Sequence, residues 1–456
     1  MQQDPDAHAP VRALEQLKEA VVRGELDAIA PLLDSLHPAE IADGMESMPQ
    51  EQRSLLWNRL MPEVRGEVLL ELHGDARSRM IDEADTADLI AAVRRLQGDE
   101  LADLDAQLPP EILDGALRAM DKDRVRRYQQ VRTFPDDTAG GLMDADAVAV
   151  REDVSVALVM RYLRRLRQRW GHMPEHMDSV VVIDESGRYK GMLRLSDLVS
   201  AEPGRAVAEL MVTEIAPVPA DMAAQTVARL FENRDLISAP VIDTDGKVIG
   251  RITVDDIVDV ILSEGEHRVL GPVGLSAETD IFAPVTTNAK SRAIWLGIHL
   301  AGAFAAAAVV SAFERSIEQL VALAVLMPVV ATMGGVAGNQ TVTLVTRGLA
   351  LRQVDRSNTL RVLSKELGVA LLNGALWAVI VGAVALIWFG HLFLGAVFGV
   401  AMLTTLLVSA LSGALIPVAM SNWGIDPAVS AGVIVTAIAD VMGFLVFLGL
   451  ATMLLL

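Results

Sequence analysis

Five long apolar segments after residue 290 constrain the fold of this chain more than any other feature. A helix that crosses a bilayer needs about 20 mostly apolar residues, and each segment reaches that length. Four of the five contain no Asp, Glu, Lys or Arg, and such runs in succession argue against an ordinary soluble core. The sequence therefore predicts an all-α transmembrane domain over residues 293–456, with spans at Ala293–Phe313, Gln319–Thr346, Leu367–Gly390, Leu392–Ser421 and Pro427–Leu456.

Charge is distributed unevenly along the chain, which carries 59 Asp and Glu against 39 Lys and Arg. Residues 1–290 contain 53 of these acids and 32 of the bases, so this part carries about −21 and the remainder is close to neutral. The absence of cysteine excludes disulfides and thiolate metal sites. The first residues lack the pattern of a signal peptide, so we expect the acidic part to stay in the cytoplasm. Its acidity argues against nucleic-acid binding.

The basic residues between the spans predict their orientation, because Lys and Arg favour cytoplasmic loops. The loop after the first span contains Arg315 alone. The loop after the second span is therefore placed inside and the carboxy terminus outside, on the evidence of Arg347, Arg352, Arg356, Arg361 and Lys365.

Asp440 is the only ionisable residue of the fifth span. A charge at that depth costs about 2.5–3.5 kcal/mol on insertion scales, so such acids usually face a wet cavity or a partner and mark an ion path. The alternative is a protonated Asp that forms a hydrogen bond between helices. Asp440 is the first candidate for a metal ligand in a pore.

In the second span, a proline and three glycines precede Asn339 and Gln340. These residues are expected to loosen a helix, and the two amides can bond freed backbone groups or the water shell of an ion. Magnesium gives up water reluctantly, so a pore that passes it hydrated needs oxygen-bearing walls and few carboxylates. Close helix packing with amide hydrogen bonds explains this motif equally well when it is considered alone.

A loose repeat of 24 residues runs through residues 11–130, which have the pattern of helices with short polar breaks. Pro38, Thr86 and Pro110 begin copies in register, and Pro62 falls on the same spacing. A repeat of this kind predicts a stack of helical units. We therefore expect an α-helical superhelical domain over residues 1–135.

A second internal repeat has an offset of 59 positions, so that Val182–Gly191 matches Val241–Gly250. Each copy predicts two strands around an Asp and Gly turn, followed by a helix. The pair resembles tandem cystathionine-β-synthase (CBS) domains, modules that commonly bind adenosine nucleotides. The resemblance implies two α/β domains, over residues 136–204 and 205–264.

The second CBS copy keeps the ribose and phosphate pattern of such modules, with Thr253 as the hydroxyl and Asp256 as the carboxylate at the helix start. These two residues are the candidates for binding ATP. Arg194 occupies the hydroxyl position of the first copy, so the pair lacks a full set of nucleotide residues. Thr253 and Asp256 fit a helix cap equally well.

Acidic residues crowd the end of the second CBS copy. Asp256, Asp259 and Glu264 lie on one face or adjacent faces of a helix, so their charges repel each other. A divalent cation between such faces would relieve the repulsion, whereas a solvated acidic face is the general alternative. We expect a connecting helix over residues 265–292 between this copy and the spans.

A helical domain, two CBS domains, a connecting helix and five spans together resemble the MgtE family of bacterial magnesium channels, over nearly the entire chain. The most specific matches are the stretch Pro328–Gln340 and the closing pattern with Asp426 and Asp440 14 residues apart. The resemblance implies a homodimer in the bacterial inner membrane that conducts Mg²⁺ along its twofold axis. It also implies that cytosolic Mg²⁺ bound to the acidic domains closes the pore.

The resemblance assigns metal contacts in two regions. In the pore they are Asp440 and Asp426, to which the amide motif adds Asn339. The regulatory positions are acids of the cytoplasmic part, namely Glu67, Asp99, Asp103, Asp235, Asp256, Asp259, Glu264 and Glu266.

Four departures from the family pattern affect this assignment. Val336 and Gly432 stand where the family usually has Asn, so the hydration of the pore is expected to differ. Ala223 replaces an acid of the second CBS copy, and the acidic run at Glu264–Glu266 is about two residues shorter. Gating by Mg²⁺ is therefore expected to be weaker or set at another concentration.

Two other functions compete with a magnesium channel. In one, the spans only tether a CBS nucleotide sensor, although Asp440 and the amides are unnecessary in an inert anchor. In the other, the chain carries another divalent cation, because carboxylate, amide and water oxygens also suit manganese, cobalt or nickel. We expect no enzymatic activity, since the sequence contains no nucleophile elbow, phosphate loop or zinc spacing.

Overall fold

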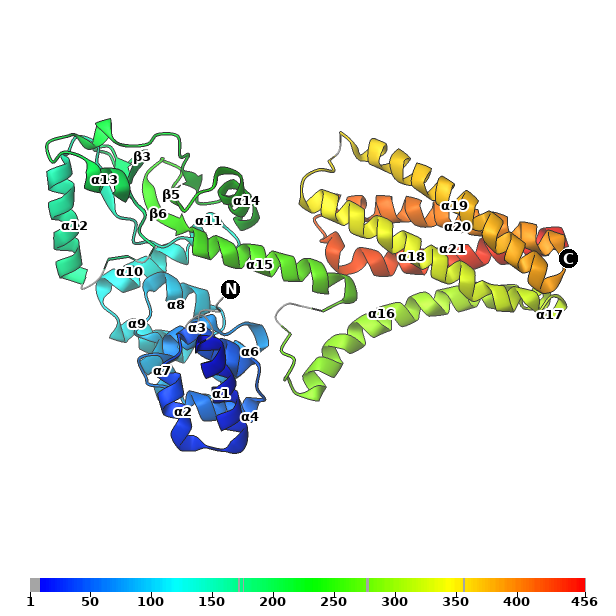
Figure 1. Ribbon diagram of the computed structural model, residues 1–456, viewed down its shortest axis with the longest axis horizontal. Coiled ribbons are helices and arrows are strands. Elements are labelled where there is room, and N and C mark those ends of the chain that lie inside the picture. The colour runs from blue at the N-terminus through cyan, green and yellow to red at the C-terminus, as the bar shows by residue number, and fades with distance from the viewer. Residues whose placement is uncertain (1–8, 171–172, 175, 276–278, 356, 456) are drawn as a thin grey trace, which may run out of the picture. The chain divides into compact units, whose positions relative to one another are not determined.

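The computed structural model describes residues 9–170, 173–174, 176–275, 279–355 and 357–455. The chain divides into two compact units. The first unit is Met1–Gly265 with Glu278–Ala283, and contains the helical repeat and the CBS pair (Figure 1). The membrane unit is Glu266–Ala277 with Pro284–Leu456, and contains the long apolar helices.

The 24-residue repeat forms a stack of short helices in which α3 packs on α5, α5 on α7 and α7 on α9. Pro38, Thr86 and Pro110 are the first residues of α3, α7 and α9, which confirms the repeat as a series of helix starts. Proline suits this position because its missing N–H would have no partner there. The helices are α1 (Ala9–Arg23), α2 (Leu26–Leu33), α3 (Pro38–Glu46), α4 (Gln50–Trp57), α5 (Arg65–Glu71), α6 (Gly74–Glu83), α7 (Thr86–Val93), α8 (Gly98–Asp105), α9 (Pro110–Ala119) and α10 (Lys122–Val131).

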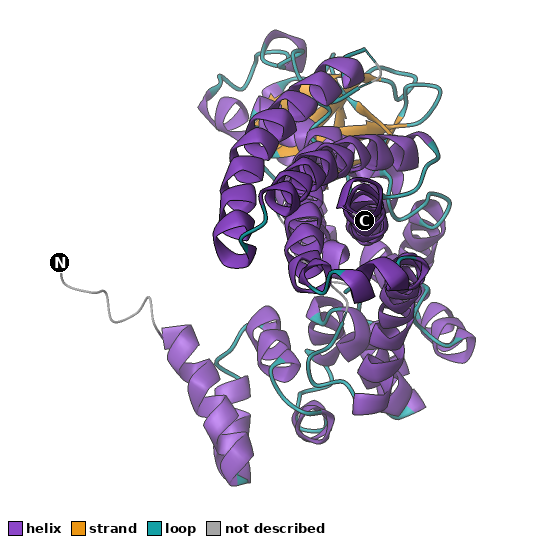
Figure 2. Cartoon of the chain, turned by 90° about the vertical axis from the view of Figure 1, so that its right-hand side faces the viewer, coloured by secondary structure: helices purple, strands orange, loops and turns teal. Residues whose placement is uncertain are grey.

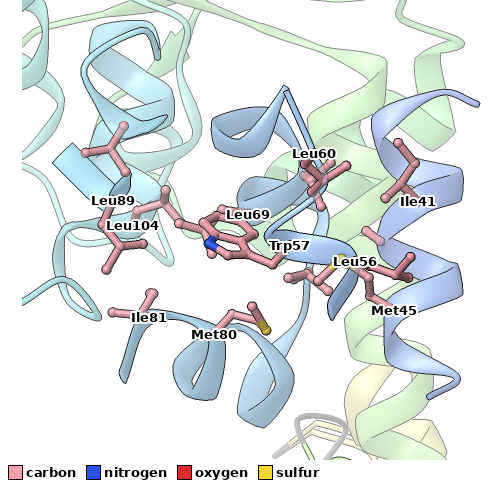
Figure 3. Close-up of a cluster of buried hydrophobic side chains, with 14 of the residues drawn as sticks. Ile41, Met45, Leu56, Trp57, Leu60, Leu69, Met80, Ile81, Leu89 and Leu104 are labelled. Carbon is pink, nitrogen blue, oxygen red and sulfur yellow. The ribbon is translucent and has the colours of Figure 1, made fainter. Parts of the chain in front are cut away.

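One continuous apolar core holds these helices together. Trp57 lies at its centre among Leu56, Leu69 and Met80, which come from three successive helices (Figure 3). Trp57 is 2% exposed, and burying an aromatic ring with its aliphatic neighbours contributes about 1.5–3 kcal/mol per side chain. The core therefore holds the helical repeat as one continuous stack rather than a string of separate helices.

The 59-residue repeat forms two three-stranded sheets with the same topology, β1-β2-β3 and β4-β5-β6. Ser179 and Ser238, which are 59 residues apart, meet through their hydroxyls at 3.3 Å, so equivalent positions of the two copies face each other. Gly187 and Gly246 both have positive φ in the equivalent hairpin turns, a conformation that favours glycine. In the described residues the strands lie in this region alone, as the orange arrows of Figure 2 show. The elements are α11 (Ala139–Leu142), β1 (Ala149–Arg151), α12 (Val156–Trp170), β2 (Ser179–Ile183), β3 (Tyr189–Arg194), α13 (Leu195–Ser200), η1 (Val207–Glu209), β4 (Val218–Pro219), α14 (Ala224–Arg234), β5 (Ser238–Ile242), β6 (Val248–Thr253) and α15 (Val254–Leu270).

The expectation of one connecting helix over residues 265–292 was wrong. The helix that enters this segment is α15, which already begins at Val254 and ends at Leu270. A short 3₁₀ turn, η2 (Gly271–Val273), and Gly274 with φ of +72° follow it. Glycine and proline end a helix in this way because one favours positive φ and the other lacks an N–H.

The membrane unit contains five helices long and apolar enough to cross a membrane, within the residues that the structure describes. They are α16 (Val285–Ala312), α18 (Ala322–Ala350), α19 (Thr359–Phe389), α20 (Leu392–Asn422) and α21 (Pro427–Leu455), with the short α17 (Glu314–Gln319) between the first two. This confirms the five predicted spans. The first helix begins two turns earlier than expected, because the polar residues from Val285 onward continue it. Helices α18, α20 and α21 pack together, while α19 lies against α20 and α16 against α21.

The glycines of α18 serve close packing and do not break the helix. The helix is continuous through Pro328, which corrects the expectation of a loosened segment. A Cβ on Gly334 would lie 2.7 Å from a methyl carbon of Thr405, and a Cβ on Gly338 would lie 2.6 Å from a methyl carbon of Val435. Larger residues at these two positions would push α18 away from α20 and α21.

Candidate ion-binding sites

An open groove of about 880 Å³ lies between α18 and α21. Residues of α18 at helical spacing line one wall, because positions three and four apart share a face. Thr436 and Asp440 line the other wall, one turn apart on α21. The polar lining side chains contributed by α18 are Thr332, Asn339, Gln340, Thr343 and Arg347.

Asp440 is half-buried in this groove, as expected for an acid on an ion path. Its carboxylate has no hydrogen-bond or ion-pair partner among the described residues. A carboxylate held there without a protein partner attracts a cation or its water shell. The structure therefore brings two of the three predicted pore residues, Asp440 and Asn339, into one groove.

Asn339 is tied to the opposite wall of the groove. Its Nδ2 donates to the Thr436 Oγ1 at 3.3 Å, and the same Thr436 hydroxyl donates to the Gly432 carbonyl at 2.9 Å. Sequence reasoning assigned Asn339 to the pore but gave Thr436 no role there, although Thr436 stands one helical turn before Asp440 and its spacing indicates a place on the same face.

Asp426, the third predicted pore residue, does not line the groove. It lies just before α21, where its Oδ1 accepts a hydrogen bond from the Ala428 N–H at 2.8 Å. Its Oδ2 is 2.6 Å from the Nε2 of His267, near the end of α15. Asp426 thus caps α21 and binds an imidazole, a partner that no sequence pattern had indicated.

The second candidate site is a crowded group of carboxylates in the first unit. Asp99 and Asp103 stand one turn apart on α8, and Asp256 begins α15. Burial, then the negative charges of Asp144 and Glu100, raise the pKa of Asp99 to about 8. A carboxyl with its pKa so high binds a proton at neutral pH unless a cation takes its place.

Asp103 and Asp256 belong to the same group. Partial desolvation by neighbouring residues, then the negative charge of Asp256, raises the pKa of Asp103, whose side chain still reaches solvent. Burial raises the pKa of Asp256 to about 6, with Asp255 and Asp144 adding to the shift. Sequence reasoning missed Asp144, which precedes the first strand of the CBS pair and comes close only through folding.

This group is suited to a hydrated ion rather than to direct coordination. Within the described residues, no three His, Asp or Glu side chains converge closely enough to hold one metal ion. Mg²⁺ usually keeps several of its waters, which can bridge carboxylates that stand farther apart. We use the name acidic cluster for Asp99, Asp103, Asp144 and Asp256.

The other predicted regulatory acids lie outside the acidic cluster. Burial raises the pKa of Asp259, and His73 opposes that shift. The Glu264 Oε2 accepts a hydrogen bond from Gln225 at 2.8 Å. Asp235 caps the end of α14 with φ of +50°. Glu67 on α5 and Glu266 on α15 are exposed.

Thr253 and Asp256, the candidate nucleotide residues, bind each other. The Asp256 Oδ2 accepts hydrogen bonds from the backbone N–H and the hydroxyl of Thr253, both at 3.0 Å. The structure therefore shows the interaction expected of a helix cap, in which the carboxylate at the helix start is already occupied by its neighbour.

Comparison with known proteins bears on the whole chain. A family model described as a divalent cation transporter, MgtE, matches residues 327–450, and one for the MgtE intracellular N domain matches residues 36–137. CBS domain models match residues 139–204 and 207–263. The magnesium transporter MgtE of Thermus thermophilus is 33% identical over 96% of this chain and 98% of its own length.

The chain belongs to the MgtE family. The magnesium transporter MgtE of Bacillus subtilis is 27% identical over 94% of each chain. A crystal structure of the cytosolic domain of the Mg²⁺ channel MgtE in complex with ATP is 30% identical, with a TM-score of 0.48, over 54% of this chain and 99% of that one. The resemblance inferred from the sequence is confirmed, as are the helical domain, the CBS pair and the apolar helices. The MgtE relatives are transporters by name.

Proposed function

We propose that this chain is a magnesium transporter of the bacterial inner membrane, and that the groove between α18 and α21 forms part of its ion path. The observation that carries this proposal is the carboxylate of Asp440, which has no hydrogen-bond or ion-pair partner in the part of the chain that the structure describes. It shares the groove with the Asn339 amide and the Thr436 hydroxyl. These groups offer oxygen ligands and a single negative charge, which suits an ion that keeps its water. The names of the relatives support magnesium as the cargo.

The path is completed by a second copy of the chain. The groove is open on one side, and a twofold axis along it would bring two Asp440 carboxylates to the same depth. Two carboxylates on opposite sides would hold a hydrated divalent ion more strongly than one. Cysteine crosslinking tests this arrangement directly because the chain has no native cysteine.

The test is cation flux into liposomes that hold the purified protein. Asp440→Ala is expected to lower Mg²⁺ flux by about tenfold or more, because it removes the one carboxylate among the described residues that line the groove. Glu318→Gln is the matched control, since Glu318 is an exposed acid of the short helix α17. Flux of Mn²⁺, Co²⁺ and Ni²⁺ in the same liposomes measures the alternative cargoes.

The outcome separates the transporter from the tethered sensor. A sensor that uses the helices only as an anchor predicts no flux in either protein, with folding confirmed. Equal Mg²⁺ flux through wild type and Asp440→Ala would remove Asp440 from the path and overturn the proposal.

The acidic cluster supports closure by cytosolic Mg²⁺. In the absence of a cation, its crowded carboxylates repel each other or take up protons, and both cost free energy. A bound ion favours the arrangement that gathers the carboxylates, so Mg²⁺ shifts the population toward that compact state. We infer that the compact state closes the pore and that repulsion at low Mg²⁺ opens it.

Limited proteolysis of the full chain tests this sensing role. Mg²⁺ is expected to protect residues 1–265 of wild type, and Asp99→Asn is expected to lose most of that protection. Asp114→Asn, an exposed acid on α9, is the control. Protease sensitivity that does not change when Mg²⁺ is removed would contradict the inference.

ATP binding at the CBS pair is a secondary proposal. It rests on the ribose and phosphate pattern that Thr253 and Asp256 keep. Because Asp256 already accepts two hydrogen bonds from Thr253, a nucleotide would have to compete with the cap. Titration of wild type and Thr253→Val with ATP measures whether the nucleotide binds in place of the cap.

A further inference from the structure

Thr436 and Gly432 both lie against the Asn339 side chain. The function proposed above uses Thr436 only as one oxygen of the groove wall and gives Gly432 no role. The Thr436 hydroxyl donates to the Gly432 carbonyl at 2.9 Å, which uses its only proton. It can therefore only accept from Asn339, whose Nδ2 lies 3.3 Å away. This contact decides which end of the Asn339 amide faces Thr436, because only the amide nitrogen can donate.

The orientation of the amide places its oxygen against Gly432. The Oδ1 of Asn339 lies 3.0 Å from the position that a Cβ at residue 432 would take. That separation is shorter than ordinary contact between a carbon and an oxygen atom, so any side chain at 432 would press on the amide. Glycine is thus the residue that leaves room for the amide oxygen at this depth.

We propose that Thr436 and Gly432 are positioning residues that hold the Asn339 amide across the groove, and that this fixed amide sets the discrimination between hydrated divalent cations. The inference rests on the proposed function, because it concerns the same ion path. Asp440 stands one turn, about 6 Å, beyond Thr436 on α21. The groove therefore presents a carboxylate and, one turn away, an amide oxygen held in one place.

A fixed oxygen discriminates better than a mobile one. A mobile amide oxygen can move to suit the water shells of ions of different radius. A held amide oxygen accepts hydrogen bonds from the waters of one shell and is badly placed for a larger or smaller shell. The carboxylate of Asp440 attracts any divalent cation by its charge, so it contributes binding strength with little selectivity. Selectivity for Mg²⁺, whose first shell of waters lies closer to the ion than that of Ca²⁺, then depends on Asn339 and on the residues that hold it.

The first test compares Thr436→Val with Thr436→Ser in liposome flux of the full chain. Valine keeps the shape and removes the acceptor, so the half-saturating Mg²⁺ concentration should rise about three- to tenfold, as for one lost hydrogen bond. The preference for Mg²⁺ over Ca²⁺ should fall by a similar factor. Serine keeps the hydroxyl and should behave as wild type.

Gly432→Ala gives an independent variant in case Thr436→Val does not fold. Its methyl group would displace the Asn339 oxygen, so it should reproduce the loss of discrimination while Thr436 is intact. A merely structural role would lower the amount of folded protein or the maximal flux in both variants and leave the Mg²⁺ to Ca²⁺ ratio unchanged.

The possible results keep this inference apart from the proposed function. Wild-type flux with unchanged half-saturation and ratio in Thr436→Val and Gly432→Ala would overturn the positioning role and leave the transporter standing. Equal damage by Thr436→Ser and Thr436→Val would also overturn it, because the hydroxyl would then not be the cause. No flux through folded wild type would overturn both.

Discussion

The two units of the molecule use carboxylates in opposite ways. In the first unit, Asp99, Asp103, Asp144 and Asp256 are crowded together, and burial and repulsion raise the pKa of Asp99 to about 8. In the membrane unit, Asp440 is the one acid among the described residues that line the groove, and the other polar groups of the wall, apart from Arg347, are uncharged. The difference fits two tasks. A sensor gains from a strained empty state that an ion relieves, whereas a path needs binding weak enough to let the ion leave.

The pair of Arg53 and Asp280 shows how an acid of the first unit behaves when a cationic side chain binds it. The Arg53 guanidinium, 0% exposed, binds Asp280 through two nitrogens at 2.6 and 2.9 Å. The Nε and Nη2 donate to the carbonyls of Met45 and Glu46 at the end of α3. Although burial opposes it, this bonding holds the pKa of Asp280 below its usual value. The pair anchors the segment just before α16 to the helical stack.

Arg53→Met should have the largest effect on stability, because it breaks a buried ion pair and leaves Asp280 with the more distant Arg79, whose Nη1 lies 4.0 Å from its Oδ2. Breaking a buried pair from one side costs about 3–5 kcal/mol. Hydrogen exchange of the full chain, followed at α3 and α4, measures the loss. The control is Arg23→Met, which removes an exposed pair with Glu19 and should cost about 0–1 kcal/mol. Equal losses of stability in the two variants would show that burial does not determine how much an ion pair contributes to the stability of this unit.

Asp99→Asn tests the acidic cluster, in which several carboxylates stand close together. A carboxyl whose pKa rises from about 4 in the unfolded chain to about 8 in the fold keeps its proton only when folded. The free energy of unfolding of the first unit should therefore fall as pH rises from about 4 to about 8 in the absence of Mg²⁺. Asp280, with its lowered pKa, contributes in the opposite sense, and its stabilisation is lost only as pH falls below about 4.

Asn at position 99 removes the titrating group, so the variant should be about 1–3 kcal/mol more stable than wild type near pH 8 without Mg²⁺. It should also gain less stability when Mg²⁺ is added. Hydrogen exchange of α8 between pH 5 and 9, with chelator or with Mg²⁺, measures both effects. A variant with the same pH dependence as wild type would show that the acidic cluster is not strained.

Periodicity explains which parts of this structure could be predicted from the sequence. The 24- and 59-residue repeats and the apolar spans each leave a local pattern, and each pattern became the expected element. Pro272 and Gly274 also carried a signal, a helix end, that the expectation of a continuous connecting helix overlooked. Asp440 and Asn339 were found because a polar group in an apolar helix stands out.

Contacts between distant residues had no such pattern. Arg53 and Asp280 are 227 residues apart, and neither looks unusual among its neighbours. Asp144 is one acid among many in an acidic half, and joins the cluster only because folding brings it beside Asp99. His267, the partner of Asp426, was missed for the same reason. Thr436, the partner of Asn339, did carry a local signal, its place one helical turn before Asp440.

Substitution of Thr405 tests whether ion passage depends on the polar groups of the groove alone, and it should have the smallest effect on flux and stability. The Thr405 hydroxyl and that of Ser409 are buried where α18, α20 and α21 pack, with no hydrogen-bond partner among the described residues. If the polar groups that matter for ion passage are those of the groove, these two hydroxyls contribute nothing to flux.

Thr405→Val keeps the shape and removes an unpaired polar atom, so stability should stay level or rise by about 0–1 kcal/mol. Thermal unfolding and Mg²⁺ flux of the same preparation measure both quantities, with Gly334→Ala as the contrasting variant because its methyl group would clash with Thr405. Loss of flux in a stable Thr405→Val protein would place the ion path, at least in part, inside the packed helices instead of in the groove.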